Sequence, residues 1–148
     1  MKLENEFTVS VPVEQAWNVL LDLERVTPCL PGAALTAQVG DEYEGTMTVK
    51  LGPATAKYNG TVKIEEADEQ NRRAVIKASG KDARGQGTAA ATIVSTLHDE
   101  GGGSTRVRVE TDMRLTGRVA QFGRGIQQDV ANKILSRFAE CLEQEIIR

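Results

Sequence analysis

The chain has 148 residues, of which 40% are hydrophobic, and this length and composition predict one domain with a single core. Its formal net charge is −3 and its arginines are scattered along the sequence, which excludes the basic stretch expected of a DNA- or RNA-binding protein. Residues 1–7 are charged, without the apolar core of a secretory signal, and no apolar run approaches the ~20 residues of a membrane span, so the sequence predicts an intracellular protein.

The N-terminal segment predicts a strand followed by short helices. Residues 2–11 become alternating toward their end, and Pro12 ends the strand. Apolar residues at helical spacing then predict a helix over residues 13–23, with a further helical turn before Pro28. The proline and glycine of residues 29–32 predict a tight, non-helical connection that carries apolar side chains.

The middle of the chain, residues 33–116, predicts six successive strands. Turn signals separate these strands at positions 40–41, 52–53, 68–71, 81–84 and 99–104. In residues 106–115, charged side chains alternate with apolar ones or threonine, which gives one wet face and one dry face. No period of about 30 residues suggests a parallel sheet built from βαβ units, so the strands are expected to be antiparallel.

The last thirty residues predict one long amphipathic helix of roughly 40 Å at about 1.5 Å per residue. Its apolar stripe consists of Val119, Phe122, Ile126, Val130, Ile134, Phe138, Leu142 and Ile146. The strand region is the only partner of similar length, so the sheet must curl around this helix. The elements together predict an α+β helix-grip domain over residues 1–148: a seven-stranded curved antiparallel sheet around a long C-terminal helix, with two short helices after the first strand.

Small residues dominate the predicted inner face of the middle strands. They are Ala54, Ala56, Gly60, Ala74, Ala78, Gly85, Gly87, Ala89 and Ala91. A normally packed core would place larger side chains at several of these positions, because truncation to alanine over an empty space typically costs about 2 to 5 kcal/mol. One interpretation is a cavity for an apolar ligand between sheet and helix. The other is that large side chains such as Phe122 and Phe138 fill the space, or that the glycines permit strong curvature.

An opening to this cavity is predicted at one end of the sheet. The connections at 51–54, 81–85 and 116–118 fall at the same end of an antiparallel meander, and the loop 29–32 is expected to join them. Glycines 117, 123 and 125 weaken the start of the long helix there, next to Arg84, Arg118 and Arg124, so this end is predicted to act as a gate. The predicted ligand-binding residues are Leu30, Pro31, Leu35, Met47, Leu51, Tyr58, Ala78, Ala89, Ala91, Met113, Leu115, Phe122, Ile126 and Val130.

The sequence predicts no catalytic residue and no metal site. His98, the only histidine, falls at a polar strand end without a ligand-spaced neighbour, which is typical of a surface histidine. No Gly-x-Ser-x-Gly motif occurs, and the acidic residues of 65–69 are typical of a solvated turn. Cys29 and Cys141 lack metal-type spacing and are expected to be free thiols in a reducing compartment, with Cys29 lining the opening and not acting as a nucleophile.

Over essentially its whole length the chain resembles the CoxG family of carbon monoxide dehydrogenase accessory proteins, within the helix-grip superfamily of START-like and Bet v 1-like domains. Three segments carry most of the resemblance: Cys29-Leu30-Pro31-Gly32-Ala33, the strand and turn of residues 45–53 (GTMTVKLGP), and residues 120–125 (AQFGRG) at the start of the long helix. Residues 131–143 (ANKILSRFAECLE) continue the pattern.

The resemblance implies a non-catalytic accessory to a molybdenum-containing CO dehydrogenase that binds a hydrophobic molecule in the grip. A respiratory quinone, menaquinone in particular, is the ligand that fits such an accessory, and no covalent cofactor is expected. The implied mechanism is extraction: the domain takes a quinone from the membrane, shields its isoprenoid tail and presents the head group to the dehydrogenase. This places the protein in the cytoplasm, peripheral to the inner face of the cell membrane.

Two other functions stay open at this stage. One is an assembly module that docks the dehydrogenase to the membrane and keeps a filled core. The other is an enzyme, because some members of the superfamily are cyclases or hydrolases. Longer members of the family continue with a Pro/Ala-rich linker and a membrane-binding segment, whereas this sequence stops at Arg148. It is therefore expected to be a short member or a shortened chain, and these residues alone predict no membrane recruitment.

Overall fold

The computed structural model describes residues 1–147 and confirms the predicted helix-grip fold. The strands are β1 (Lys2–Val9), β2 (Ala33–Val39), β3 (Glu42–Leu51), β4 (Ala54–Asp68), β5 (Arg73–Asp82), β6 (Thr88–Gly101) and β7 (Ser104–Leu115). The helices are α1 (Val13–Leu20), α2 (Leu23–Val26) and α3 (Arg124–Cys141). Short 3₁₀ turns form η1 (Thr27–Cys29) and η2 (Arg118–Gln121), and a π-helical turn forms η3 (Leu142–Ile147). No helix among these residues is long and apolar enough to cross a membrane.

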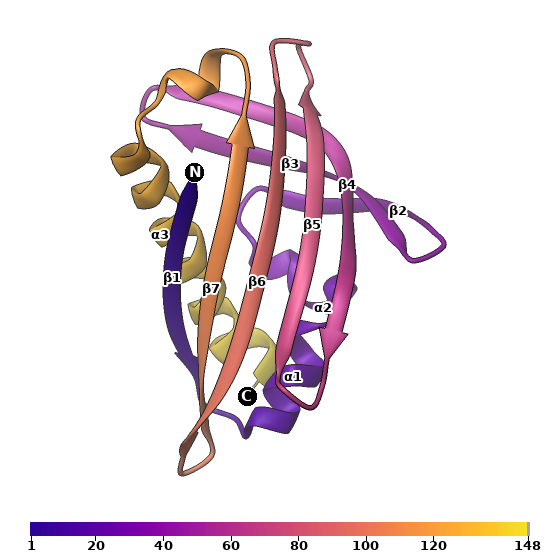
Figure 1. The fold of residues 1–148 in the computed structure, drawn as a ribbon, viewed down its shortest axis with the longest axis vertical. Coiled ribbons are helices and arrows are strands. Elements are labelled where there is room, and N and C mark those ends of the chain that lie inside the picture. The colour runs from indigo at the N-terminus through magenta and orange to yellow at the C-terminus, as the bar shows by residue number, and fades with distance from the viewer. Residues whose placement is uncertain (148) are drawn as a thin grey trace.

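All seven strands form one antiparallel sheet in the order β1-β7-β6-β5-β4-β3-β2. The sheet bends strongly, so that β2 and β3 cross over the end where α3 begins, and α3 lies along its concave side behind β1 and β7 (Figure 1). Side-chain amides hold α3 to β1: Asn5 Nδ2 donates to Asn132 Oδ1 at 2.6 Å, and Gln128 Nε2 donates to the Glu4 carbonyl at 3.0 Å. The helix is therefore attached mainly to one edge of the sheet.

The C-terminal helix begins later than predicted. Val119 lies in the 3₁₀ turn η2, Phe122 is extended, and Gly123 precedes the first residue of α3. This break changes which side chains face inward: Ile126 is 44% exposed, whereas Gln127 is 7% exposed and donates from Nε2 to the Phe122 carbonyl at 2.8 Å. The prediction of one uninterrupted stripe from Val119 was therefore wrong over its first two turns.

Several glycines serve curvature and tight contacts. A Cβ atom on Gly60 would lie 1.9 Å from the Ser79 carbonyl oxygen, and one on Gly45 would lie 2.5 Å from the Ala34 oxygen. The backbones of neighbouring strands approach so closely there that only glycine fits. Gly85 and Gly87 were wrongly predicted on the inner face, because both have positive φ and lie in the connection between β5 and β6.

Gly117, at the junction between β7 and η2, is expected to be the most substitution-sensitive glycine of the gate region. Its φ of +85° combined with a ψ of −156° suits only glycine, and an added Cβ would lie 1.8 Å from the Gln86 carbonyl oxygen. We expect Gly117→Ala to lower the free energy of unfolding by at least about 2 kcal/mol. Gly125→Ala, inside α3 with nothing near its added Cβ, should leave it unchanged or raise it by up to about 1 kcal/mol. Urea denaturation measures both, and equal effects would contradict this account.

The core consists of two separate apolar clusters. The first cluster packs α1, α2 and the C-terminal half of α3 on the sheet, and its buried members include Trp17, Val107, Phe138 and Leu142. The second cluster lies at the other end, where Leu51, Ala56, Tyr58 and Val119 are buried. Its partly buried members are Val49, Ala89, Leu115, Phe122 and Val130.

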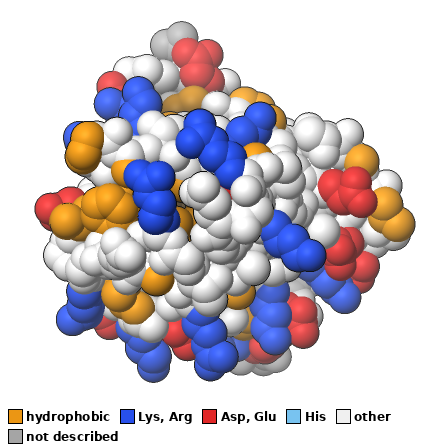
Figure 2. Space-filling model, turned by 90° about the horizontal axis from the view of Figure 1, so that it is seen from above, with side chains coloured by type: hydrophobic (Ala, Val, Ile, Leu, Met, Phe, Trp, Pro, Cys, Tyr) orange, Lys and Arg blue, Asp and Glu red, His pale blue; other side chains and the backbone are white. Residues whose placement is uncertain are grey.

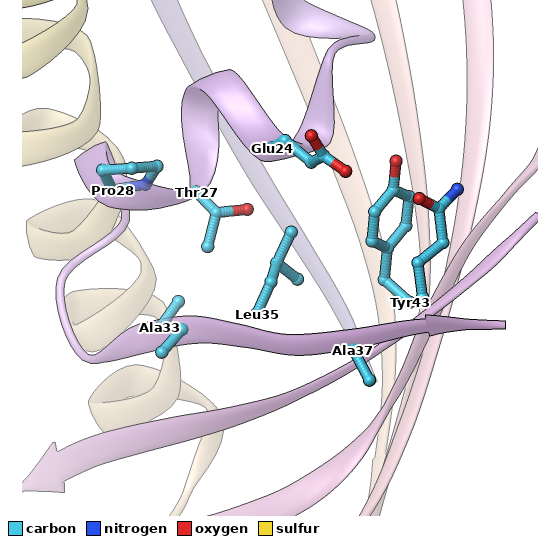
Figure 3. A pocket seen from close by; sticks show the side chains of 9 residues that line it. Glu24, Thr27, Pro28, Ala33, Leu35, Ala37 and Tyr43 are labelled. Atoms are coloured by element: carbon cyan, nitrogen blue, oxygen red, sulfur yellow. The ribbon is translucent and has the colours of Figure 1, made fainter.

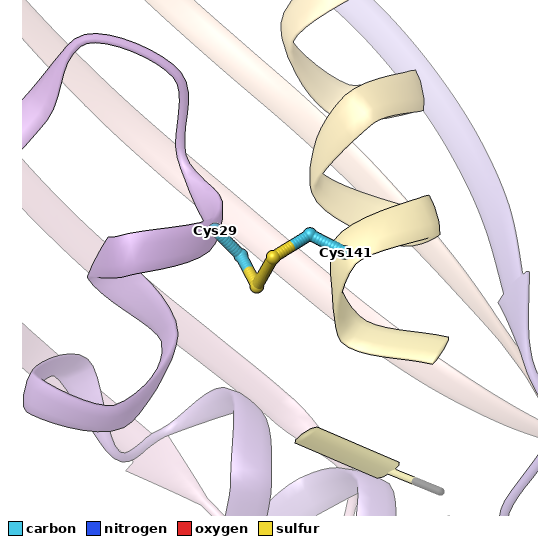
Figure 4. The surroundings of a disulfide bond; sticks show 2 residues. All are labelled: Cys29 and Cys141. Atoms are coloured by element: carbon cyan, nitrogen blue, oxygen red, sulfur yellow. A yellow bond between two sulfur atoms is a disulfide. The ribbon is translucent and has the colours of Figure 1, made fainter. Parts of the chain in front are cut away.

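A disulfide bond joins Cys29 to Cys141, so the prediction of two free thiols was wrong (Figure 4). Their Cα atoms lie 5.4 Å apart across 112 residues of sequence. The tertiary fold brings η1 against the end of α3, which no local pattern in the sequence reveals. Cys29 is buried in the first cluster and does not line an opening.

Candidate functional site

Between the two clusters, the concave face of the sheet carries a row of apolar side chains that belong to neither cluster. Five residues form this row, which we call the central belt: Tyr43, Val62, Ala78, Ala91 and Met113. Each is the cross-strand partner of the next, from β3 to β7, and each is half-buried. None of the five packs against the buried residues of either cluster within the described chain.

Strand β6 shows how the packing changes along the concave face. Ala89 packs in the second cluster and Ile93 packs against the first, whereas Ala91, which lies between them, does neither. On α3, Val130 belongs to the second cluster and Phe138 to the first, and Ile134 between them is half-buried and outside both. A packed core normally continues without such a break. The sheet and helix therefore leave an incompletely filled space between the clusters, bordered by small side chains.

Tyr58 in the second cluster has a buried hydroxyl group without a partner. The residue is 8% exposed and packs with Leu51, Ala56 and Val119, and no hydrogen-bonding atom within the described residues reaches its hydroxyl oxygen. Burial and the charge of Asp82 raise the pKa of Tyr58, so the phenol keeps its proton at neutral pH. Leaving a polar group unpaired in an apolar environment costs about 1 to 3 kcal/mol. The phenol is therefore a free hydrogen-bond donor at the end of the grip.

An open groove reaches the β3 end of the central belt. It has a volume of about 590 Å³ and lies between the α2–η1 segment and strand β2, with the Tyr43 side chain at one end (Figure 3). Its lining residues are Glu24, Thr27, Pro28, Ala33, Ala34, Leu35, Ala37, Gln38 and Tyr43. Partial burial, followed by the charges of Glu24 and Asp22, raises the pKa of Tyr43. The groove thus combines an apolar floor with an acidic rim.

The structure brings together ten of the fourteen predicted ligand-binding residues in these three places. The second cluster contains Leu51, Tyr58, Ala89, Leu115, Phe122 and Val130, the central belt contains Ala78, Ala91 and Met113, and the groove contains Leu35. Leu30 packs on the first cluster instead, and Ile126 is on the exposed side of α3. Pro31 and Met47 are half-buried outside both clusters. Their part in binding stays a prediction.

Tyr43, Val62 and the α2–η1 wall were missing from the predicted site. Strand alternation could have identified Tyr43, because it shares a face with Met47 and Leu51. The wall had no such signal, because its position depends on how α2 packs in three dimensions.

The predicted gate was correct in part. The β3–β4, β5–β6 and β7–η2 connections lie at the same end of the sheet (Figure 1). The 29–32 loop does not join them, because Cys29 is bonded to Cys141 and Leu30 packs on the first cluster. Val119 is buried against Leu51 at this end, so the second cluster closes it.

The titratable residues add no second site. His98 is exposed at the far end of β6, and the acidic turn is solvated: Lys77 pairs with Glu65, and Arg73 pairs with Glu66. Hydrogen bonds from Asn71 lower the pKa of Asp68 in the same turn. Residues 1–147 contain no group of three or more His, Cys, Asp or Glu side chains placed to hold a metal ion.

Comparisons with known proteins agree with this architecture. The sequence model of the carbon monoxide dehydrogenase CoxG family matches residues 6–147. A conserved protein from Geobacillus kaustophilus superimposes with a TM-score of 0.85 at 20% identity, covering 99% of this chain and 95% of that one. A START superfamily protein from Mycobacterium smegmatis superimposes with a TM-score of 0.65 at 13% identity, covering 98% and 96%.

An enzyme has the same fold. The Zhui aromatase/cyclase from Streptomyces sp. R1128 superimposes with a TM-score of 0.65 at 11% identity, covering 98% of this chain and 92% of that one. At such identities these likenesses show the fold alone. No curated protein matches this sequence.

Proposed function

Because this chain belongs to the carbon monoxide dehydrogenase CoxG family, we propose that it is a carrier that binds a respiratory quinone in its grip and serves a molybdenum CO dehydrogenase. Menaquinone is the ligand we favour. The carrier takes the quinone from the membrane pool, shields the prenyl tail beneath α3, and presents the head group to the dehydrogenase at the inner face of the cell membrane.

The gap between the two clusters is the observation that carries this proposal. A prenyl chain is a flexible apolar group that would occupy the space along Ala78, Ala91 and Met113 and remove those half-exposed side chains from water. An enclosed isoprene unit buries about 100 Å² of apolar surface, which contributes roughly 2.5 kcal/mol at about 25 cal/mol per Å². Two or three enclosed units would therefore compete with partitioning into a membrane.

The Tyr58 phenol supports a quinone over a plain hydrocarbon. A quinone carbonyl is a hydrogen-bond acceptor, and the buried hydroxyl of Tyr58 is a donor without a partner. A head group placed in the second cluster would satisfy this donor, so the cost of the unpaired group in the empty protein becomes a gain on binding.

A non-catalytic role fits the chemistry of the belt. Its five residues carry one titratable group, the Tyr43 phenol, and the raised pKa of that phenol makes it a poor base at neutral pH. An enzyme on this fold would need an acid and a base that both reach the bound ring. Turnover of a polyketide-like substrate would contradict the carrier proposal.

The function is tested by titrating the protein with menaquinone in detergent and following Trp17 fluorescence together with ligand absorbance. We expect saturable binding, and we expect organic extracts of protein from a quinone-producing host to contain an isoprenoid quinone. Clean extracts and unchanged signals would contradict the proposal.

Tyr58→Phe should change stability and affinity in opposite directions. Removing the unpaired hydroxyl should raise the free energy of unfolding of the empty protein by about 1 kcal/mol, whereas affinity for menaquinone should fall about 2- to 10-fold because one hydrogen bond is lost. Tyr43→Phe is the matched control: it removes the only other tyrosine hydroxyl, at a less buried position, and should change stability by less than about 0.5 kcal/mol. A Tyr58→Phe variant that binds menaquinone as tightly as the original chain would remove the phenol from the site.

A further inference from the structure

Positive charge gathers at the end of the molecule that the second cluster closes. The three segments that form this end, residues 48–58, 80–88 and 113–126, contain seven basic residues and one acidic residue, in a chain of net charge −3. The basic residues, which we call the basic end, are Lys50, Lys57, Lys81, Arg84, Arg114, Arg118 and Arg124. All seven are exposed. Seen from above, lysine and arginine side chains project across this face, with apolar side chains between them (Figure 2).

The charges of the basic end are not neutralised within the described chain. None of the seven side chains forms a salt bridge there, whereas Lys63, Arg72, Arg73, Lys77, Arg106 and Arg108 each pair with a carboxylate elsewhere. The one acidic residue, Asp82, is half-buried, and its Oδ1 accepts a hydrogen bond from the Arg84 backbone at 2.8 Å. Unpaired cations of this number create a positive field at one end of an acidic protein.

Apolar groups accompany these cations. Ile126 in the first turn of α3 is 44% exposed, and Phe122 is half-buried beside it in the chain. The backbone around Gly123 and Gly125 leaves open space where side chains would otherwise stand. Cations that surround exposed apolar side chains suit a lipid surface, where the charges meet phosphate groups and the apolar groups enter the interface.

We propose that the basic end docks the protein on an anionic phospholipid surface. The proposal rests on the proposed function for its purpose, because docking at this end places Tyr58 and the Val119 plug next to the lipid from which a quinone is drawn. The acidic rim of the groove, formed by Glu24 with Asp22 nearby, is unsuited to such a surface. The two openings of the grip would therefore face different surroundings: the basic end faces lipid, and the groove is free for a partner protein.

The test is co-sedimentation of the full chain with vesicles of phosphatidylcholine that contain phosphatidylglycerol, compared with vesicles of phosphatidylcholine alone. We expect binding only to the anionic vesicles and release by high salt. Each basic side chain near such a surface contributes about fivefold to binding, so Arg84→Glu with Arg118→Glu should weaken it by more than about 25-fold. The charge-conserving pair Arg84→Lys with Arg118→Lys should retain it.

Lys133→Glu with Arg137→Glu is the matched control. These two cations lie on the exposed side of α3 outside the basic end and change the net charge by the same amount, so vesicle binding should fall only slightly. Equal loss in both double variants, or no binding of the original chain to anionic vesicles, would overturn the proposal. Binding to purified CO dehydrogenase or to nucleic acid that only the Arg84/Arg118 reversal abolishes, without vesicle binding, would assign the surface to that partner instead.

Menaquinone titration in detergent separates this proposal from the carrier function. If the Arg84/Arg118 reversal binds menaquinone normally but not vesicles, both stand. If no variant binds menaquinone while vesicle binding follows the basic end, the carrier function fails and docking stands.

Discussion

Replacement of Ala91 by tryptophan is expected to abolish menaquinone binding while leaving the domain folded. Ala91 is half-buried in the middle of the central belt, between Ala78 and Met113 on the neighbouring strands, and packs in neither core cluster. An indole there fills the space that a prenyl chain would occupy. Exclusion of a single isoprene unit loses roughly 2.5 kcal/mol, so affinity should fall by at least about 50-fold. Fluorescence and absorbance titration measure this loss, and thermal unfolding checks the fold.

Ala90→Trp is the control for this substitution. Ala90 is the next residue on the same strand, but it is exposed on the convex face, where an indole meets solvent. Both variants add the same side chain to β6, and only the inward one should affect binding. Normal menaquinone affinity in a folded Ala91→Trp protein would show that the ligand does not occupy the belt. It would favour the assembly-module function, in which the grip carries no cargo.

Loss of the Cys29–Cys141 disulfide is expected to have the largest effect on stability. The bond closes a loop of more than a hundred residues and joins η1 to the end of α3. Removal of a native disulfide typically costs about 2 to 5 kcal/mol, and the chain-entropy contribution is greatest for long loops. We expect a reductant to lower the urea midpoint of the original chain by a corresponding amount. The groove wall should loosen as well, because η1 forms part of it.

Cysteine variants show whether the cross-link itself is responsible. Cys141→Ala removes a half-buried side chain and should lower the urea midpoint about as far as the reductant does, with no further effect of reductant on the variant. Cys29→Ala, at a fully buried position, should lose somewhat more, because it also leaves a cavity. A thiol titration that finds two free cysteines in the native protein would contradict the bond.

The site shows where sequence reasoning succeeded and where it stopped. Strand alternation correctly placed Ala89 and Ala91 on the inner face, because side chains along a strand point to opposite faces whatever surrounds them. The same argument failed for Gly85 and Gly87, which lie in a connection whose limits depend on contacts with Thr116 and Gln86. The interpretation of glycines as curvature residues was confirmed at Gly45 and Gly60, where the strands touch.

Long-range placement was beyond the sequence in three further respects. Arginines and lysines that are scattered along the chain converge on one end of the sheet, because three separate connections meet there. The two cysteines are brought together by the packing of η1 on α3. The break at Phe122 and Gly123 exposes Ile126 and buries Gln127, because η2 must first cross the end of the sheet before α3 can begin.

The sequence by itself determined the fold class, the number and order of the strands, and the parity of the small residues on the inner face, since these follow from local periodicity and from turn-forming residues. Only the tertiary structure decided that the core divides into two clusters with an incompletely packed belt between them, that Tyr58 buries an unpaired hydroxyl, and that seven cations share one end. Those properties depend on distances between residues far apart in the chain, which a hydrophobic pattern does not encode.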